Sequence, residues 1–248
     1  MKKRTVHEAR QGRSNGSMPR LSARGRRLPP EVLSHAEVCA LMEACGRYAP
    51  LGLRNRALIA LLYRAGLRIN EALSLYPKDL DLDDGSVRVL HGKGGKSRTV
   101  GLDPGAAVII ERWLEARSRC LALLLPTRPE PRGNGPQAHD SSPTSVTAPR
   151  YAFGRLPLFC TLRGRPMSAA YVRRLLKRLA ARAGIEKRVH AHGLRHTHAA
   201  QLRAEGVDIA IISRQLGHTS ITTTARYLDH LAPRAVIEAM RRRVWTSV

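Results

Sequence analysis

The C-terminal third of the chain holds side chains that could act together on a phosphate. His192-Gly193-Leu194-Arg195-His196 is followed by Leu216-Gly217-His218 and then by Tyr227. Arginine and histidine donate hydrogen bonds to phosphate oxygens and stabilise extra negative charge on them. A tyrosine beside such groups is a candidate nucleophile on phosphorus. The pattern therefore predicts that a phenolic oxygen cleaves a phosphodiester without water or metal.

The composition points to a polyanionic partner. The 248 residues include 43 Lys and Arg against 19 Asp and Glu, a formal net charge of +24. A basic surface supplies the salt-dependent, sequence-independent part of nucleic-acid affinity. Charge alone fits a ribosomal or nucleoid protein equally well, so only the candidate site distinguishes a DNA enzyme from these.

Cysteine usage and hydropathy favour an intracellular protein. The four cysteines form no Cys-x-x-Cys pair and no zinc-ribbon spacing, so reduced thiols are expected. No secretory signal and no apolar run of about 18 residues is present. We expect a cytoplasmic protein that is associated with the nucleoid when it acts.

Three segments flank or interrupt the predicted catalytic domain, which spans residues 30–232. Residues 1–29 carry nine Lys and Arg against Glu8 alone, which predicts a disordered basic arm, either a solvated leader or a tail that tracks DNA. Residues 126–150 contain six prolines and predict a flexible insertion of unassigned role. Residues 233–248 predict a tail helix, which packs either within the chain or on a neighbouring protomer.

The elements that must position the candidate site are mostly helices. Ser34 and Glu37 form a capping box that begins a helix, and glycines, Gly66 among them, end several others. Asp103-Pro104 starts a long helix toward Leu121. Helices are expected at 35–46, 54–65, 70–75, 104–121, 168–184, 191–205, 208–216 and after Ser220, and strands at 86–90, 96–100 and 158–161. The fold class predicted is mainly α with a small antiparallel β-sheet (α+β).

Six motifs in order resemble the tyrosine recombinase (phage integrase) family over about residues 30–230. Gly66–Glu71 looks like its first arginine box, and Gly92–Lys96 looks like its lysine hairpin. The two histidine motifs look like its second and third boxes, and the tyrosine follows His218 by nine residues. The resemblance implies the fold of DNA breaking-rejoining enzymes, integrase activity of the kind found in mobile genetic elements, and the catalytic set Arg68, Lys93, His192, Arg195, His218 and Tyr227.

The resemblance also implies a role for each residue of that set. Tyr227 attacks in line and forms a 3′-phosphotyrosyl link, so the reaction needs no ATP, metal or other cofactor. The two arginines bind non-bridging oxygens, and the histidines add hydrogen bonds to the phosphate. His192 could accept the phenolic proton, and Lys93 would protonate the departing 5′ oxygen.

Further residues are expected to support the site. Glu71 lies three residues after Arg68 and could orient its guanidinium, or form only a surface ion pair. The residues expected to contact DNA are Lys96, Arg98, Arg173, Arg174 and Lys177. Double-stranded DNA is the expected partner, bound by a homotetramer on paired sites with a possible accessory DNA-bending protein and no membrane.

Other interpretations fit individual motifs. Gly95-Lys96-Ser97 ends like a phosphate-binding loop, but Leu90 stands where that pattern needs glycine, so we reject it. The dense histidines around His192 leave a zinc site open. A type IB topoisomerase shares the phosphotyrosine chemistry, and a catalytically idle DNA-binding regulator or a truncated remnant could share the fold. Because Arg68 comes early in the sequence, we expect this chain to lack the N-terminal core-binding domain that is usual in the family.

Overall fold

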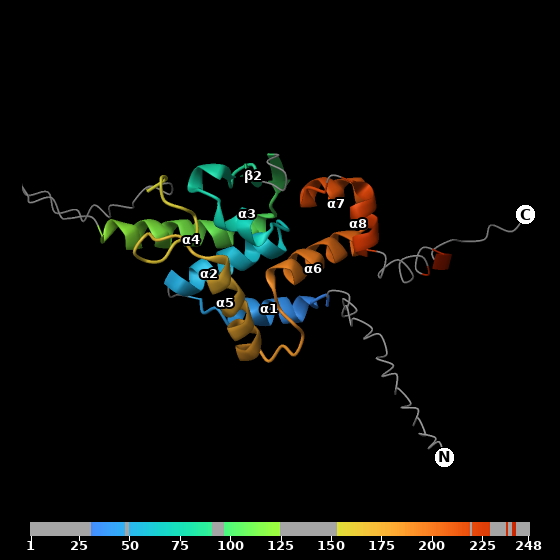
Figure 1. The fold of residues 1–248 in the computed structure, drawn as a ribbon, viewed down its shortest axis with the longest axis horizontal. Helices are drawn as coiled ribbons and strands as arrows, with labels where there is room; N and C mark the ends of the chain where they lie inside the picture. The colour runs from blue at the N-terminus through green and yellow to red at the C-terminus, as the bar shows by residue number, and fades with distance from the viewer. Residues whose placement is uncertain are drawn as a thin grey trace, which may run out of the picture.

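The computed structural model describes residues 31–47, 50–90, 97–124, 153–218, 220–228, 237 and 240–241 (Figure 1). It is mostly helical with a three-stranded antiparallel sheet, as predicted. The helices are α1 (His35–Glu43), α2 (Pro50–Tyr63), α3 (Ile69–Leu73), α4 (Pro104–Ala122), α5 (Ala169–Arg182), α6 (Ala191–Ala204), α7 (Ile209–Leu216) and α8 (Ile221–Leu228), with one 3-10 turn, η1 (Pro77–Asp79).

Helix α2 forms the centre of the hydrophobic core. Ten of its residues are buried, around most of its circumference, as expected for a helix covered by neighbours on several sides. It packs against α4 and α6, and α5 and α1 lie below it in Figure 1. From α4, the indole of Trp113 is 1% exposed, and its Nε1 donates to the carbonyl of Leu158 at 3.0 Å. Packing on several sides therefore fixes the position of the C-terminal end of α2, which the turn at Gly66 follows.

The sheet has the strand order β1-β2-β3, with β1 (Leu80–Asp81), β2 (Ser86–Val89) and β3 (Arg98–Gly101). Val87 pairs with Val100 in the antiparallel register, and both side chains are buried. The strand predicted at 158–161 is wrong: there the structure has only an isolated bridge from Cys160 to Pro166. A tight turn over 161–164 brings the bridged residues together, and this segment does not join the sheet.

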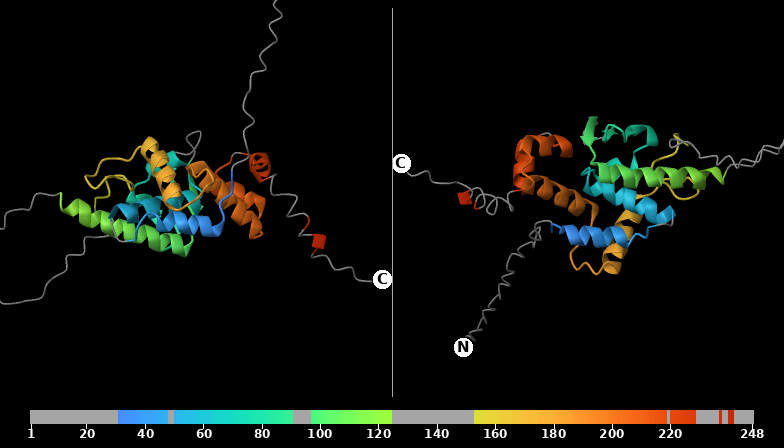
Figure 2. Two further views of the ribbon diagram at one scale, coloured as in Figure 1. Left: turned by 90° about the horizontal axis from the view of Figure 1, so that it is seen from below. Right: turned by 180° about the vertical axis from the view of Figure 1, so that it is seen from behind.

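The last three helices form a smaller unit beside the sheet (Figure 2). Ala199, Ile212 and Leu216 form a small buried apolar cluster within it, while Leu194 of α6 packs in the main core. Helix α7 contacts β3 and α8, and α8 also contacts α6. Gly217 ends α7 in the left-handed conformation at φ +63°, so the chain turns sharply before His218.

Helix boundaries differ slightly from the prediction. Helix α2 begins at Pro50 and not at Arg54, because proline is well accepted in the first turn, where its missing N–H would have no helical partner. The predicted caps at Ser34 and Asp103 are confirmed, since each side chain accepts a hydrogen bond from the first turn of its helix. Ser168 caps α5 in the same way.

Several predictions lie outside the described residues. These are the basic arm, the insertion at 126–150, the lysine hairpin at Gly92–Lys96 and nearly all of the tail helix. Within the described part of the chain, no helix is both long and apolar enough to cross a bilayer.

Candidate active site

Arg68 stands at the junction of α2 and α3. Gly66 ends the α2 region at φ +64°, and Arg68 caps α3. Its backbone N–H donates to Oε2 of Glu71 at 2.8 Å, and its Nη1 donates to Oε1 of the same carboxylate at 2.7 Å. The Arg68 side chain keeps 30% of its surface exposed. The guanidinium is therefore oriented by Glu71 and remains accessible from solvent.

Glu71 is a buried carboxylate shared by two arginines. Its side chain is 3% exposed, so the simple surface ion pair left open above is wrong. Arg98, from β3, donates Nη1 and Nη2 to the two carboxylate oxygens at 2.9 Å each. Burial favours the neutral acid, but hydrogen bonds from Arg98 and Arg68 outweigh it and lower the pKa of Glu71 to about 2. Glu71 is thus ionised at pH 7.

Arg98 was predicted to contact DNA, and its contacts in the structure indicate a different role. Only 14% of its side chain is exposed, because the guanidinium faces Glu71. Its other neighbour is Gly217, where an added Cβ would lie 2.6 Å from Nε of Arg98. Arg98 therefore connects β3, α3 and the end of α7, and direct contact with DNA stays an untested prediction.

Arg195 is a buried residue of α6 that joins this helix to the turn after α2 and to the end of α7. It is 1% exposed. Its Nη1 donates to the carbonyl of Gly66 at 2.6 Å, and its Nη2 donates to the carbonyl of Leu216. The same Nη2 lies 3.2 Å from Nε2 of His218. These three contacts fix the orientation of the guanidinium.

His218 lies directly after the left-handed Gly217 and faces the arginines. Its Nδ1 lies 2.8 Å from Oγ1 of Thr224 in α8. Burial and the nearby cations, Arg195 first among them, lower the pKa of His218 to about 4. The imidazole is therefore neutral at pH 7.

His192 occupies the first turn of α6 and is exposed. Its ring stacks between those of His190 and His196, with centroid distances of 6.4 and 6.3 Å. Partial burial and the charge of Arg195 lower the pKa of His192. A neutral, exposed imidazole at the start of a helix is suited to accept a proton.

The remaining predicted residues are described to different extents. Tyr227 belongs to α8, one turn after Thr224. Lys93 and Lys96 lie outside the described residues. Arg173, Arg174 and Lys177 are exposed on α5, opposite its buried apolar face. The structure thus brings Arg68, Arg195 and His218 together. His192 lies near enough for the charge of Arg195 to lower its pKa.

Two residues near the site were missed by the sequence prediction. Thr224 is fully buried against His218, but it lies in a run of three threonines that gave no sign of which one turns inward. His198 is buried beneath Gly66, where an added Cβ would lie 2.7 Å from its Cδ2. Its spacing of three residues from Arg195 could have indicated a shared helix face.

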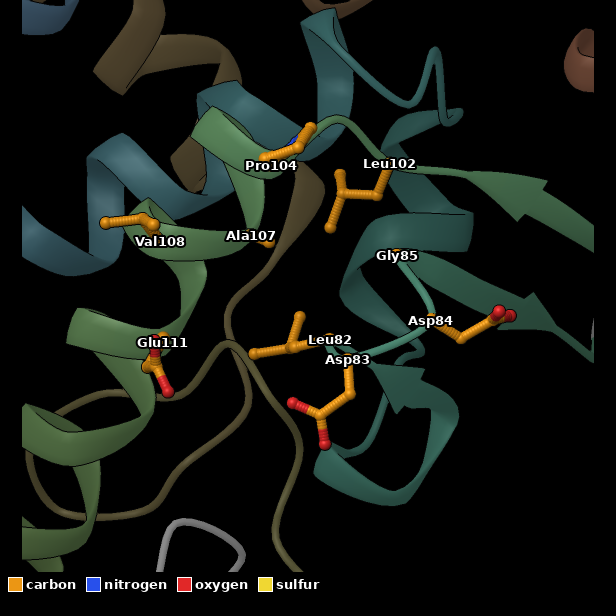
Figure 3. A pocket seen from close by; sticks show the side chains of 9 residues that line it. All are labelled: Leu82, Asp83, Asp84, Gly85, Leu102, Pro104, Ala107, Val108 and Glu111. Carbon is orange, nitrogen blue, oxygen red and sulfur yellow. The ribbon is translucent and has the colours of Figure 1, made fainter.

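A separate hollow lies away from this cluster, between α4 and the turn that joins β1 to β2 (Figure 3). It measures about 370 Å³ and carries the carboxylates Asp83, Asp84 and Glu111. Negative side chains disfavour a phosphate, so this hollow does not fit the predicted chemistry. Among the residues that the structure describes, no group of three His, Cys, Asp or Glu side chains could hold a metal ion.

Comparison with known proteins agrees with this arrangement. The profile described as the phage integrase family matches residues 31–234. The tyrosine recombinase XerD of Ralstonia nicotianae is 37% identical over 203 residues, which cover 82% of this chain and 56% of the relative. The XerD of Bifidobacterium longum is 34% identical, with 84% of this chain and 61% of the relative covered. The chain thus spans somewhat more than half the length of these curated relatives.

Solved structures show the same fold. The crystal structure of XerA recombinase has a TM-score of 0.64 at 28% identity and covers 88% of this chain and 67% of that one. XerH recombinase, bound to a palindromic difH substrate in a post-cleavage complex, has a TM-score of 0.60 at 28% identity and covers 87% and 54%. With the profile match over most of its length, this chain belongs to the phage integrase family.

Proposed function

We propose that this chain is a site-specific DNA recombinase that cleaves and rejoins duplex DNA through Tyr227. One observation carries the proposal: Arg195 joins the carbonyl of Gly66, 129 residues away, to the ring of His218, 23 residues away. The first, second and third boxes of the sequence therefore meet at one guanidinium. Family membership supports the same reaction.

The chemistry follows from the charges at this place. Tyr227 would attack the phosphorus, expel the 5′ oxygen and form a 3′-phosphotyrosyl ester, which the 5′ hydroxyl of another strand reverses. Arg68, held by Glu71 and still exposed, is the group best placed to donate to a phosphate oxygen. Because the ester replaces one phosphodiester bond with a bond of similar energy, strand exchange needs no ATP.

Proton transfer would involve two further residues. A phenol with a pKa of about 10 needs a base at pH 7. His192 is exposed, and its pKa is lowered, so it is neutral and able to accept the proton. We assign protonation of the leaving 5′ oxygen to Lys93 on the resemblance alone.

Double-stranded DNA is the proposed substrate, and the similarity to XerH recombinase, which was solved bound to a palindromic difH substrate, supports this choice. The exposed Arg173, Arg174 and Lys177 of α5 would contact the phosphates of the duplex. We further propose action in the cytoplasm at the nucleoid, as a homotetramer on paired sites, with an accessory DNA-bending protein where the site requires one.

Covalent trapping tests the proposal. Duplexes nicked near the expected cleavage position, taken from DNA flanking the gene and from short palindromic sites, are incubated with the full chain. The expected result is a protein–DNA adduct on denaturing gels, lost in Tyr227→Phe and retained in the control Tyr76→Phe. An adduct that survives in Tyr227→Phe would assign the nucleophile to another residue.

The same experiment separates the alternatives. Relaxation of supercoiled plasmid without preference for a site would indicate topoisomerase activity. Salt-sensitive DNA binding by the wild type with no adduct on any duplex would contradict the recombinase and indicate a DNA-binding regulator.

A further inference from the structure

Thr224 connects the helix that carries Tyr227 to the candidate pocket. Its side chain is 0% exposed, whereas Thr222 and Thr223 beside it are exposed. Its Oγ1 lies 2.8 Å from Nδ1 of His218. Three residues, slightly less than one helical turn, separate Thr224 from Tyr227 in α8. Loss of this hydrogen bond would therefore alter the position of α8 close to Tyr227.

Two neighbours of the His218 ring indicate which nitrogen carries the proton. Nε2 lies 3.2 Å from Nη2 of Arg195, and a guanidinium has donors only. Nε2 must therefore be the acceptor. In a neutral imidazole the proton then resides on Nδ1, and this N–H donates a hydrogen bond to Oγ1 of Thr224. His218 is neutral at pH 7 because burial and the charges of Arg195, Arg68 and Arg98 lower its pKa to about 4.

We propose that Thr224 is a positioning residue for strand cleavage, which accepts a hydrogen bond from the Nδ1–H of His218 and thereby keeps the Nε2 lone pair directed at Arg195. The inference rests on the proposed recombinase function. Without this acceptor the ring could take the other tautomer, and its Nε2–H would then face an N–H of the guanidinium. The attraction between His218 and Arg195 would become repulsion. His218 would then no longer connect Arg195 to α8.

The tautomer can be measured directly in the DNA-free protein. Long-range ¹H–¹⁵N spectra of the ¹⁵N-labelled full chain report which ring nitrogen is protonated, and His218→Gln identifies the His218 signals. At pH 7 we expect the proton on Nδ1 in the wild type and in Thr224→Ser. Thr224→Val has nearly the same shape without the acceptor, and we expect it to shift His218 toward the Nε2–H form. A wild-type proton on Nε2 would overturn the inference, even if Thr224→Val failed to fold.

Cleavage supplies the functional measurement. In the trapping assay, Thr224→Val should lower the rate of adduct formation by about tenfold, the lower end of the range of about 10- to 100-fold found when the hydrogen-bond partner of a metal-ligating histidine is removed. Thr224→Ser should restore the rate to within about twofold of the wild type. Thr223→Val, the same change at an exposed position of the same helix, should leave the rate unchanged.

The pH profile distinguishes positioning from a general loss of structure. Among the residues that the structure describes, the charged or titratable groups that act on His218 are Arg195, Arg68, Arg98 and His192. Because Thr224 would act through His218, Thr224→Val should change the shape of the rate profile on its acid side, whereas a merely destabilised variant would keep that shape. A normal rate in Thr224→Val despite a shifted tautomer would overturn the positioning role. Absence of any wild-type adduct would count against the recombinase, and the NMR result would still decide the hydrogen bond on which the role of Thr224 depends.

Discussion

At the scale of single residues, the candidate site is organised by a few buried polar groups that hold the arginines. Glu71 accepts hydrogen bonds from Arg68 and from Arg98, which lies 27 residues further along the chain. Arg195 is held by backbone carbonyls and by His218. Such contacts orient guanidinium groups before a phosphate binds, which would reduce the reorganisation that the proposed reaction requires. Arg98, expected at the DNA surface, belongs to this supporting set.

Buried neutral histidine also makes the stability of the protein depend on pH. His198 is 6% exposed, and burial lowers its pKa to about 4, below its unfolded value of about 6.5. The unfolded state therefore binds more protons between these values, and stability falls as the pH is lowered through that window. Between pH 7 and pH 5 we expect His198 to account for a loss of about 2 kcal/mol in the free energy of unfolding.

Urea denaturation at pH 7 and pH 5 measures this loss. The difference between the two pH values should be smaller in His198→Gln than in the wild type by about the same 2 kcal/mol. Glu71 does not interfere, because its pKa of about 2 confines its effect to pH values below about 4.5. An equal difference in both proteins would show that His198 does not titrate as its burial indicates.

At the scale of elements, the glycine turns decide how closely the helix ends approach. Gly66 adopts φ +64°, and its carbonyl accepts a hydrogen bond from Arg195. An added Cβ would lie 2.7 Å from Cδ2 of His198 and 3.0 Å from Cδ2 of Leu216. The end of α2 can therefore contact α6 and α7 only because this residue has no side chain.

Gly66→Ala should lower the free energy of unfolding for two reasons, and a matched variant at Gly184 distinguishes them. The left-handed conformation costs about 1–2 kcal/mol for a residue with a Cβ. Overpacking against His198 and Leu216 should add about 1–3 kcal/mol. Gly184 has nearly the same φ, +66°, with nothing within 4 Å of an added Cβ, so Gly184→Ala should show only the first cost. Urea denaturation compares the two, and equal losses would show that the packing at Gly66 is unimportant.

At the scale of the whole molecule, the residues that the structure describes present basic side chains on more than one face. Arg173, Arg174 and Lys177 are exposed on α5, and the opposite face of this helix is buried in the core. Another group, Arg47, Arg112 and Arg119, lines a groove between α2 and α4. Net charge alone cannot show which of these faces binds the DNA backbone.

Salt dependence of DNA binding can distinguish the two faces. Replacing Arg173, Arg174 and Lys177 together by Gln should reduce the slope of log K against log salt by about 2–3, since each phosphate contact contributes about 0.9. The triple change of Arg47, Arg112 and Arg119 to Gln removes the same charge and should alter the slope much less. Equal reductions in fluorescence anisotropy titrations would mean that binding follows total charge and not the α5 surface.

The sequence by itself determined the family and the order of the helices, and it supplied the residues that are proposed to be catalytic. These depend on local signals: capping residues, glycines that end helices, and motifs of a few residues. The tertiary structure decided the contacts between distant segments, namely Arg98 on Glu71, Arg195 on the carbonyls of Gly66 and Leu216, and Thr224 on His218. No local pattern specifies these contacts, because whether a polar side chain meets solvent, DNA or another side chain depends on which elements pack together around it.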